Sequence, residues 1–249
     1  MSESHPHSSW RRWVVLAAAL AGIAVTASLG RWQLGRAAQK EALQAAIDSR
    51  SRLPAVMLNE TSRPSDADPA LLHRPVMLHG HWVEQHTVFL DNRQMNGRPG
   101  FYVVTPLQLS GRSDAVLVQR GWAPRDVQDR TRLPKVPTPA GDVRLEGRIA
   151  PPPAKLYEFD GTASGPIRQN LDLASYEQEI GTSLWPVSVV QTAVANGGPD
   201  DGLLREWPAP AVDVHKHYGY AFQWFAMSAL MAGLYVWFQL LRPRLRGAR

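Results

Sequence analysis

The chain of 249 residues contains no cysteine. Disulfide bridges, thiolate nucleophiles and metal centres built on cysteine are therefore excluded. The G-x-S-x-G turn of serine hydrolases and the glycine-rich loops that follow nucleotide-binding strands are also missing. Ser164 has no histidine near it in sequence, and the acidic pairs at 177/179 and 200/201 are typical of solvated helix or loop positions. We therefore expect a protein that catalyses no covalent reaction.

Charge is missing from two long apolar runs, Trp13 to Gly30 and Tyr218 to Leu241, of 18 and 24 residues. A helix needs about 20 apolar residues to cross the hydrocarbon core of a bilayer. Both runs are therefore predicted to be transmembrane helices. The first run, with its preceding arginine pair, also fits a secretory signal peptide that would be cleaved before Ser28. We prefer an anchor, because the run is longer than the apolar core of a usual signal peptide.

The net charge of +5 belongs to the two ends of the chain. The segment before the first run contains Arg11 and Arg12 and one acidic residue, Glu3, and four arginines and no acid follow the second run. The positive and negative charges of residues 31–217 cancel. Positive residues beside membrane helices stay in the cytoplasm, so we expect cytoplasmic termini and no nucleic-acid partner. The predicted order is a tail (1–12), a transmembrane helix (13–30), a periplasmic β-rich domain (31–217), a second transmembrane helix (218–241) and a tail (242–249).

Small residues recur at every fourth position of the first run, at Ala18, Gly22, Thr26 and Gly30. Such a stripe lets a second helix approach closely. The predicted partner is the second run, which offers Ser228 with Ala232 and Ala229 with Gly233. Residues 31–50 are rich in helix formers, so the first helix is expected to continue beyond the bilayer and to end before Pro54.

The interior is predicted to be α+β, a small and mostly antiparallel barrel or sandwich with one or two short helices. Segments rich in Val, Leu and aromatic residues predict strands at 75–83, 87–92, 102–109, 115–121, 143–150 and 186–192. QMNGRPG at 94–100 predicts a hairpin-like connection, and the proline clusters LPKVPTPAG and APPPAK predict loops. One helix is expected up to Ile180, with Asp172 capping its free amides and Gly181 ending it.

His79 and His81 alternate on one side of a predicted strand, and His86 follows the turn. Such a pattern can bind a metal ion, although two solvent-facing histidines on an edge strand explain it as well. The six methionines are scattered along the sequence and give no support to a thioether copper site.

His217 directly precedes the second apolar run, which places it at the non-cytoplasmic edge of the bilayer. On a helix it shares a face with Tyr220, Ala221 and Trp224. An imidazole beside an aromatic wall suits a haem iron and its macrocycle, whereas an aromatic belt at the membrane edge would need no cofactor. His215 is the alternative ligand and lies about 200° around the helix from His217, so both are not expected to bind one iron.

Five segments resemble motifs of the Surfeit locus protein one family, in the same order along the chain. They are LGRWQLGR (29–36), HRPVMLHGHW (73–82), GFYVVTPLQL (100–109), AVLVQRGWAPRD (115–126) and HYGYAFQW (217–224). The resemblance covers both apolar runs and most of the interior. It implies an assembly factor of the haem–copper cytochrome c oxidase, with two spans in an inner membrane and a domain on its periplasmic or intermembrane side. The twelve residues before the first run are too few for a usual mitochondrial transit segment, so we expect the bacterial inner membrane and a periplasmic domain.

The same resemblance implies that the protein binds haem a transiently and assists its insertion into oxidase subunit I, with enzymes of haem a synthesis as further candidate partners. His217 matches the family's candidate axial ligand of the haem iron. Trp32, Gln33 and Arg36 match residues at the edge of the first span and are candidate wall or propionate contacts of the haem, with packing between the helices as the alternative. Arg36 and Arg120 are candidate propionate contacts if they face the bilayer surface. The alternative function is a scaffold that stabilises a subunit I intermediate without binding haem.

Overall fold

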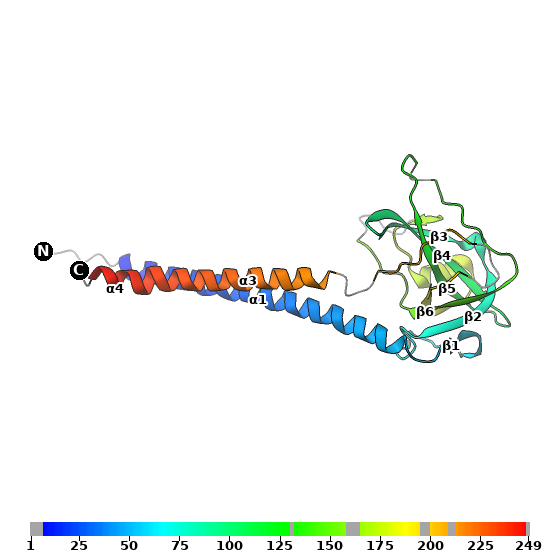
Figure 1. Ribbon diagram of the computed structural model, residues 1–249, viewed down its shortest axis with the longest axis horizontal. Coiled ribbons are helices and arrows are strands. Elements are labelled where there is room, and N and C mark those ends of the chain that lie inside the picture. Colours follow the sequence, from blue (N-terminus) through cyan, green and yellow to red (C-terminus); the bar gives the residue numbers. More distant parts are fainter. Residues whose placement is uncertain (1–6, 130–131, 158–164, 195–199, 209–212, 248–249) are drawn as a thin grey trace. The chain divides into compact units, whose positions relative to one another are not determined.

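The computed structural model describes residues 7–129, 132–157, 165–194, 200–208 and 213–247 (Figure 1). The chain divides into two compact units, which are described separately. One unit comprises the described parts of residues 1–45 and 209–249, and the other those of residues 46–208.

The first unit is a pair of helices. Helix α1 spans His7–Arg50, its last residues lying in the second unit, and α3 spans Val214–Tyr235. A π-helical segment, η3 (Val236–Leu241), and α4 (Arg242–Gly247) follow α3 without a break. Both long helices are long and apolar enough to cross a membrane, and almost none of their apolar stretches is buried within the protein. As predicted, the first helix continues beyond its apolar run and ends before Pro54.

Helices α1 and α3 lie side by side and antiparallel (Figure 1). The small-residue stripe of α1 forms the contact: a Cβ at Gly30 would lie 2.8 Å from the Phe225 ring, and one at Gly22 would lie 3.0 Å from Sδ of Met231. The Ser228 hydroxyl donates to the carbonyl of Ile23 over 3.3 Å. The predicted pairing of the two apolar runs is therefore confirmed at these positions.

The second α3 motif does not take part in this contact. Ala229 is exposed, and a Cβ at Gly233 would meet nothing within 4 Å. Positions 229 and 233 lie about 100° around the helix from Ser228 and Ala232, so only one of the two pairs can face α1.

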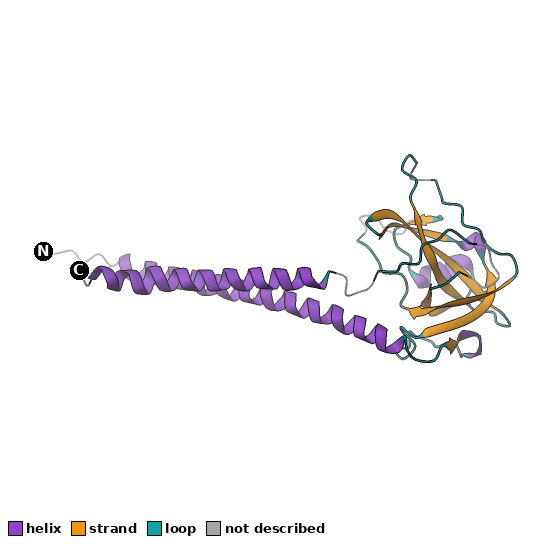
Figure 2. Cartoon of the chain, in the orientation of Figure 1, coloured by secondary structure: helices purple, strands orange, loops and turns teal. Residues whose placement is uncertain are grey.

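The second unit is a β-barrel with two short helical turns and one α-helix (Figure 2). Strands β2 (Pro75–Trp82), β6 (Asp142–Ala150), β8 (Leu184–Gln191), β5 (Ala115–Pro124) and β4 (Arg98–Leu109) pair in that order. Pairing between β4 and β2 closes the ring. Strands β1 (Val56–Met57), β3 (Val88–Met95) and β7 (Ile167–Arg168) extend the sheet at its edges, and the short turns are η1 (Leu58–Glu60) and η2 (Glu84–His86).

The predicted strands are all present, and most are longer than expected. The antiparallel pairings predominate, but β1–β2, β3–β7 and β5–β8 are parallel. The connection between β3 and β4 is a two-residue turn at Asn96 and Gly97, which both have positive φ, of 52° and 73°. An Asn-Gly pair adopts this conformation readily and fits the twist of a hairpin.

Helix α2 (Leu173–Ile180) begins and ends as predicted. The Asp172 side chain accepts from the backbone N–H of Ser175 and caps the helix, and Gly181, with φ of 65°, ends it. Tyr176 of this helix is buried against β3, β4 and β5.

The main core fills the interior of the barrel. Inward-facing side chains of all five ring strands meet there, with Trp185 fully buried among them. Each such side chain contributes about 1.5–3 kcal/mol on burial. Leu58 of η1 also belongs to this core, which fixes the chain immediately after β1 against the barrel wall.

Candidate functional site

The strongest candidate site lies in the helix pair at His217. Nδ1 of His217 is 2.8 Å from Oε1 of Gln33 on α1. An amide oxygen only accepts hydrogen bonds, so Nδ1–H is the donor, and in the neutral ring Nε2 then carries the free lone pair. Among the described residues Nε2 has no hydrogen-bond partner.

The residues around His217 on α3 divide into a side that faces α1 and an open side. At about 100° per residue, Ala221 lies about 40° from His217 in one direction, and Trp224 and Tyr220 lie about 20° and 60° in the other. Ala221 is 2% exposed against α1, whereas Tyr220 is 50% exposed. His217 therefore lies at the border between the helix contact and the open side.

Helix α1 has the same division around Gln33. Ala37 lies about 40° from Gln33 in one direction, and Arg36 and Trp32 lie about 60° and 100° in the other. Ala37 is fully buried, whereas Trp32 is 57% exposed and Arg36 is exposed with its guanidinium donating to Gln39 over 3.1 Å.

Because the helices are antiparallel, the open sides of α1 and α3 fall on the same side of the pair. We call this surface the open flank; it comprises Trp32, Arg36, Tyr220 and Trp224, with His217 and Gln33 at its border. Arg36 lies about 4.5 Å from Gln33 toward the Arg50 end of α1, and Tyr220 and Trp224 follow His217 in the opposite direction by about 4.5 and 10.5 Å. The six predicted site residues thus line one side of the helix pair.

A second hydrogen bond joins the helices on the other side of the pair. The Tyr218 hydroxyl donates to Oε1 of Glu41 over 2.8 Å. This contact could not be predicted from the sequence, because nothing in the local sequence of either residue points to the other. Together the two bonds fix the rotation of α3 against α1, and hence which side chains reach the open flank.

The alternative ligand and one predicted propionate contact lie elsewhere. His215 is exposed and turned away from the Gln33 contact. Arg120 is 2% exposed inside the barrel domain, where it donates to Thr138 over 2.8 Å and to the Pro137 carbonyl over 2.9 Å. Burial lowers the pKa of Arg120 and Asp201, 3.8 Å away, opposes this effect. Arg120 was a candidate propionate contact only if it faces the bilayer surface, and its burial in the barrel domain shows that this condition is not met.

The sequence left open a metal site at His79 and His81, with two solvent-facing histidines as the alternative. His79 and His81 do lie on the outer face of β2, and Nδ1 of His81 is 4.0 Å from Asp142. In the part of the chain that the structure describes, however, no three His, Asp or Glu side chains gather in a way that could hold a metal ion.

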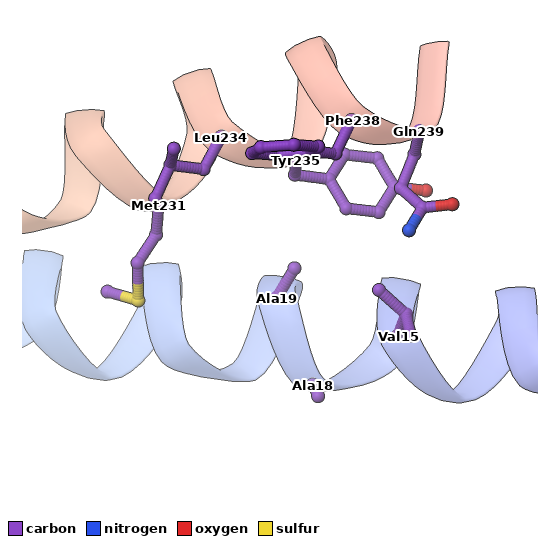
Figure 3. A pocket seen from close by; sticks show the side chains of 8 residues that line it. All are labelled: Val15, Ala18, Ala19, Met231, Leu234, Tyr235, Phe238 and Gln239. Carbon is purple, nitrogen blue, oxygen red and sulfur yellow. The ribbon is translucent and has the colours of Figure 1, made fainter. Parts of the chain in front are cut away.

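A hollow of about 400 Å³ lies farther along the helix pair, between α1 and the C-terminal part of α3 with η3 (Figure 3). Its nearest lining residue on α3, Met231, is about 21 Å along the helix from His217. Its lining is apolar except for Tyr235 and Gln239. The hollow is therefore separate from the open flank.

Comparison with known proteins identifies relatives over most of the chain. The model described as the SURF1 family matches residues 20–229. Surfeit locus protein 1 of Rattus norvegicus is 26% identical over 239 residues, which are 88% of this chain and 73% of the rat protein. Cytochrome oxidase assembly protein SHY1 of Saccharomyces cerevisiae is 28% identical over 120 residues, 48% of this chain but only 31% of the yeast protein. A SURF1-like protein of Rickettsia felis is 30% identical over 97 residues, 38% of this chain and 40% of that protein. The matched region contains both long helices in part and the whole barrel, and it includes all six residues at the open flank. The chain therefore belongs to the SURF1 family.

Proposed function

We propose that this protein assists the assembly of a cytochrome oxidase by holding haem a at His217 and releasing it to subunit I. The name of the yeast relative, an assembly protein of cytochrome oxidase, supports the assembly role. The observation that carries the haem role is the state of His217: Nδ1 is held by Gln33, and Nε2 is unpartnered beside an aromatic surface. In this role the protein catalyses no covalent reaction.

The residues present fit a haem. Haem a, when bound, would supply an iron to which an imidazole nitrogen can bind, and Nε2 of His217 would hold it. Metal-binding histidines usually donate their other ring N–H to an oxygen acceptor, which fixes the tautomer and the ring orientation. Gln33 provides that acceptor at 2.8 Å.

The open flank offers the other groups that a haem needs. Tyr220, Trp224 and Trp32 provide a flat apolar wall next to His217. Arg36 lies about one helical turn beyond Gln33 toward the Arg50 end and can pair with a carboxylate in a bidentate manner. Binding through His217 alone, without His215, would also favour release of the haem.

The positions of the charges support the rest of the proposal. Arginines flank each apolar run at the end nearest the chain terminus. We therefore assign both termini to the cytoplasm and the barrel domain to the periplasm of a bacterial inner membrane. His217 and Arg36 then lie near the outer headgroups, where subunit I can receive haem. Enzymes of haem a synthesis are the proposed source of that haem.

The test is the visible spectrum of the full-length protein, purified in detergent from cells that make haem a. Wild type is expected to show a Soret band, and His217→Ala is expected to lose at least nine-tenths of it. His215→Ala is the matched control, two residues away and exposed, and is expected to keep the band. Retention of the Soret band and haem stoichiometry in His217→Ala would show that His217 is not the ligand.

The alternative is a scaffold that stabilises a subunit I intermediate and never binds haem. In the same purification, wild type that carries oxidase subunits but no haem would establish the scaffold and exclude the haem role. Loss of haem in His217→Ala with unchanged recovery of oxidase subunits would show the opposite.

A further inference from the structure

The outer face of β2 brings together two methionines that are 20 positions apart in sequence. Met57 of β1 is the direct partner of Met77 in the parallel pairing of β1 with β2. Their exposed fractions are 43% and 41%, so both thioethers lie on the outside of the barrel wall. Neighbouring strands are about 4.8 Å apart, which places the two side chains side by side.

His79 lies on the same outer face, two residues after Met77 and hence about 7 Å along the strand. Its ring nitrogens have no hydrogen-bond partner among the described residues. Met57, Met77 and His79 all line one hollow of about 420 Å³. The three flexible or rotatable side chains can therefore reach a common point, since Met has three rotatable bonds.

The backbone that carries this group is held rigidly. The Asn59 side chain accepts from the backbone N–H of His79 over 3.0 Å and donates to its carbonyl over 2.9 Å. Leu58, between Met57 and Asn59, is fully buried in the barrel core. Met57 is thus tied to the backbone of His79, although the sequence separates them by a loop.

We infer that Met57, Met77 and His79 form a binding site for Cu(I). Two thioethers are soft, uncharged ligands that select Cu(I) over the harder divalent ions, which prefer oxygen. A neutral imidazole is a borderline ligand that also binds copper. The hollow also contains Arg144, the direct partner of His79 on β6, whose charge opposes a cation, but Asp142 and Glu146 lie on either side of Arg144 and outnumber it. Glu146 is the direct partner of Met77 and offers a nearby negative charge.

The test is an anaerobic titration of the full-length protein with Cu(I) in competition with a Cu(I)-specific chelator. Wild type is expected to retain one Cu(I) per chain, and Met57→Leu, Met77→Leu and His79→Gln to weaken retention at least tenfold each. Leu has nearly the volume of Met, so the barrel is expected to fold in these variants. Met227→Leu is the matched control, because Met227 is equally exposed but lies on α3, and it is expected to bind as wild type.

X-ray absorption of the loaded protein is expected to show two sulfur ligands and one nitrogen. Failure of wild type to hold Cu(I) against the chelator would overturn the inference. The inference would also be overturned if Met227→Leu or His217→Ala lost Cu(I) while Met77→Leu retained it. The site is independent of the proposed haem role: the methionine variants are expected to keep the Soret band of wild type.

Discussion

Nδ1 of His217 and Oε1 of Gln33 are 184 positions apart in sequence and 2.8 Å apart in space. This bond joins the two apolar helices and determines which ring nitrogen of His217 is free. Gln33 is one of the predicted haem contacts. Its bond to Nδ1 further predicts that Gln33 positions the histidine.

Gln33→Leu is expected to lower haem retention about tenfold, because loss of an oxygen partner of a metal-binding histidine typically costs 10- to 100-fold in affinity. Gln33→Glu is expected to retain haem, since a carboxylate accepts from Nδ1–H more strongly than an amide. Gln223→Leu, an exposed position on α3, is the control for substitution of a glutamine in this region.

A second measurement separates positioning from general damage to the helices. Nitrogen NMR of the haem-free protein is expected to show a single Nδ1–H tautomer of His217 in wild type and a mixture of tautomers in Gln33→Leu. A single unchanged tautomer in Gln33→Leu would contradict the positioning role, whatever the haem content.

Gly30→Leu is expected to separate the helices near the site, because a Cβ there would already lie 2.8 Å from the Phe225 ring. Gly35→Leu is the control, because a Cβ at Gly35 would meet nothing within 4 Å. The natural chain lacks cysteine, so cysteines introduced by Ile23→Cys and Ser228→Cys can report helix contact by their rate of cross-linking. Gly30→Leu is expected to slow cross-linking severalfold and to reduce the Soret band. Equal cross-linking rates in Gly30→Leu and Gly35→Leu would refute close packing at Gly30.

Asp201→Asn is expected to destabilise the barrel domain. The carboxylate is 7% exposed, accepts from Arg205 over 2.5 Å and lies 3.8 Å from Arg120. Removing its charge leaves two buried guanidinium groups without their shared anion, and a loss of about 3 kcal/mol in the free energy of unfolding is expected. Urea denaturation followed by tryptophan fluorescence measures this loss. Asp200→Asn, next in sequence, retains an oxygen that can accept from Gly202 and is expected to change stability by less than about 0.5 kcal/mol.

The cap of α2 is expected to weaken at acid pH. Hydrogen bonds from Lys155 and then from the backbone and hydroxyl of Ser175 lower the pKa of Asp172 to about 2. In the unfolded chain this pKa is about 3.9. A carboxyl whose pKa is lower in the folded state stabilises the fold above the unfolded value and loses that contribution as pH falls from about 4 toward 2.

Asp172→Ala is therefore expected to lower the free energy of unfolding by about 1 kcal/mol at neutral pH, as for loss of a helix cap. Its difference from wild type is expected to shrink between pH 4 and pH 2. A difference that stays constant over this range would show that the Asp172 carboxylate does not contribute. Glu60→Gln, an exposed position in η1, serves as the control for loss of one acidic charge.

Several features of the fold follow from short stretches of sequence. Asp172 and Gly181 mark the ends of α2, and Asn96–Gly97 marks the β3–β4 turn, because caps and turns depend on the conformations of a few adjacent residues. The strand ends were less accurate. Strand β4 continues to Arg98 because pairing with β3 and β5 extends it beyond its own apolar segment.

The site itself was predicted only in part. Sequence and family resemblance selected His217 and the residues of the open flank, since they stand beside the apolar runs. The contact between His217 and Gln33, the bond from Tyr218 to Glu41 and the burial of Arg120 could not be predicted, because each depends on which side of an element faces a distant partner.

The sequence by itself determined the two apolar helices, the concentration of net charge at the chain ends and the small-residue stripe along α1. These are properties of composition and of helical period, and a single segment carries each of them. The tertiary structure alone decided the closure of the barrel by β4 on β2, the pairing of Met57 with Met77 and the orientation of the His217 ring. Each of these joins segments far apart in the chain. The absence of cysteine excludes thiolate sites, and the thioether and imidazole groups that remain are brought together only by folding.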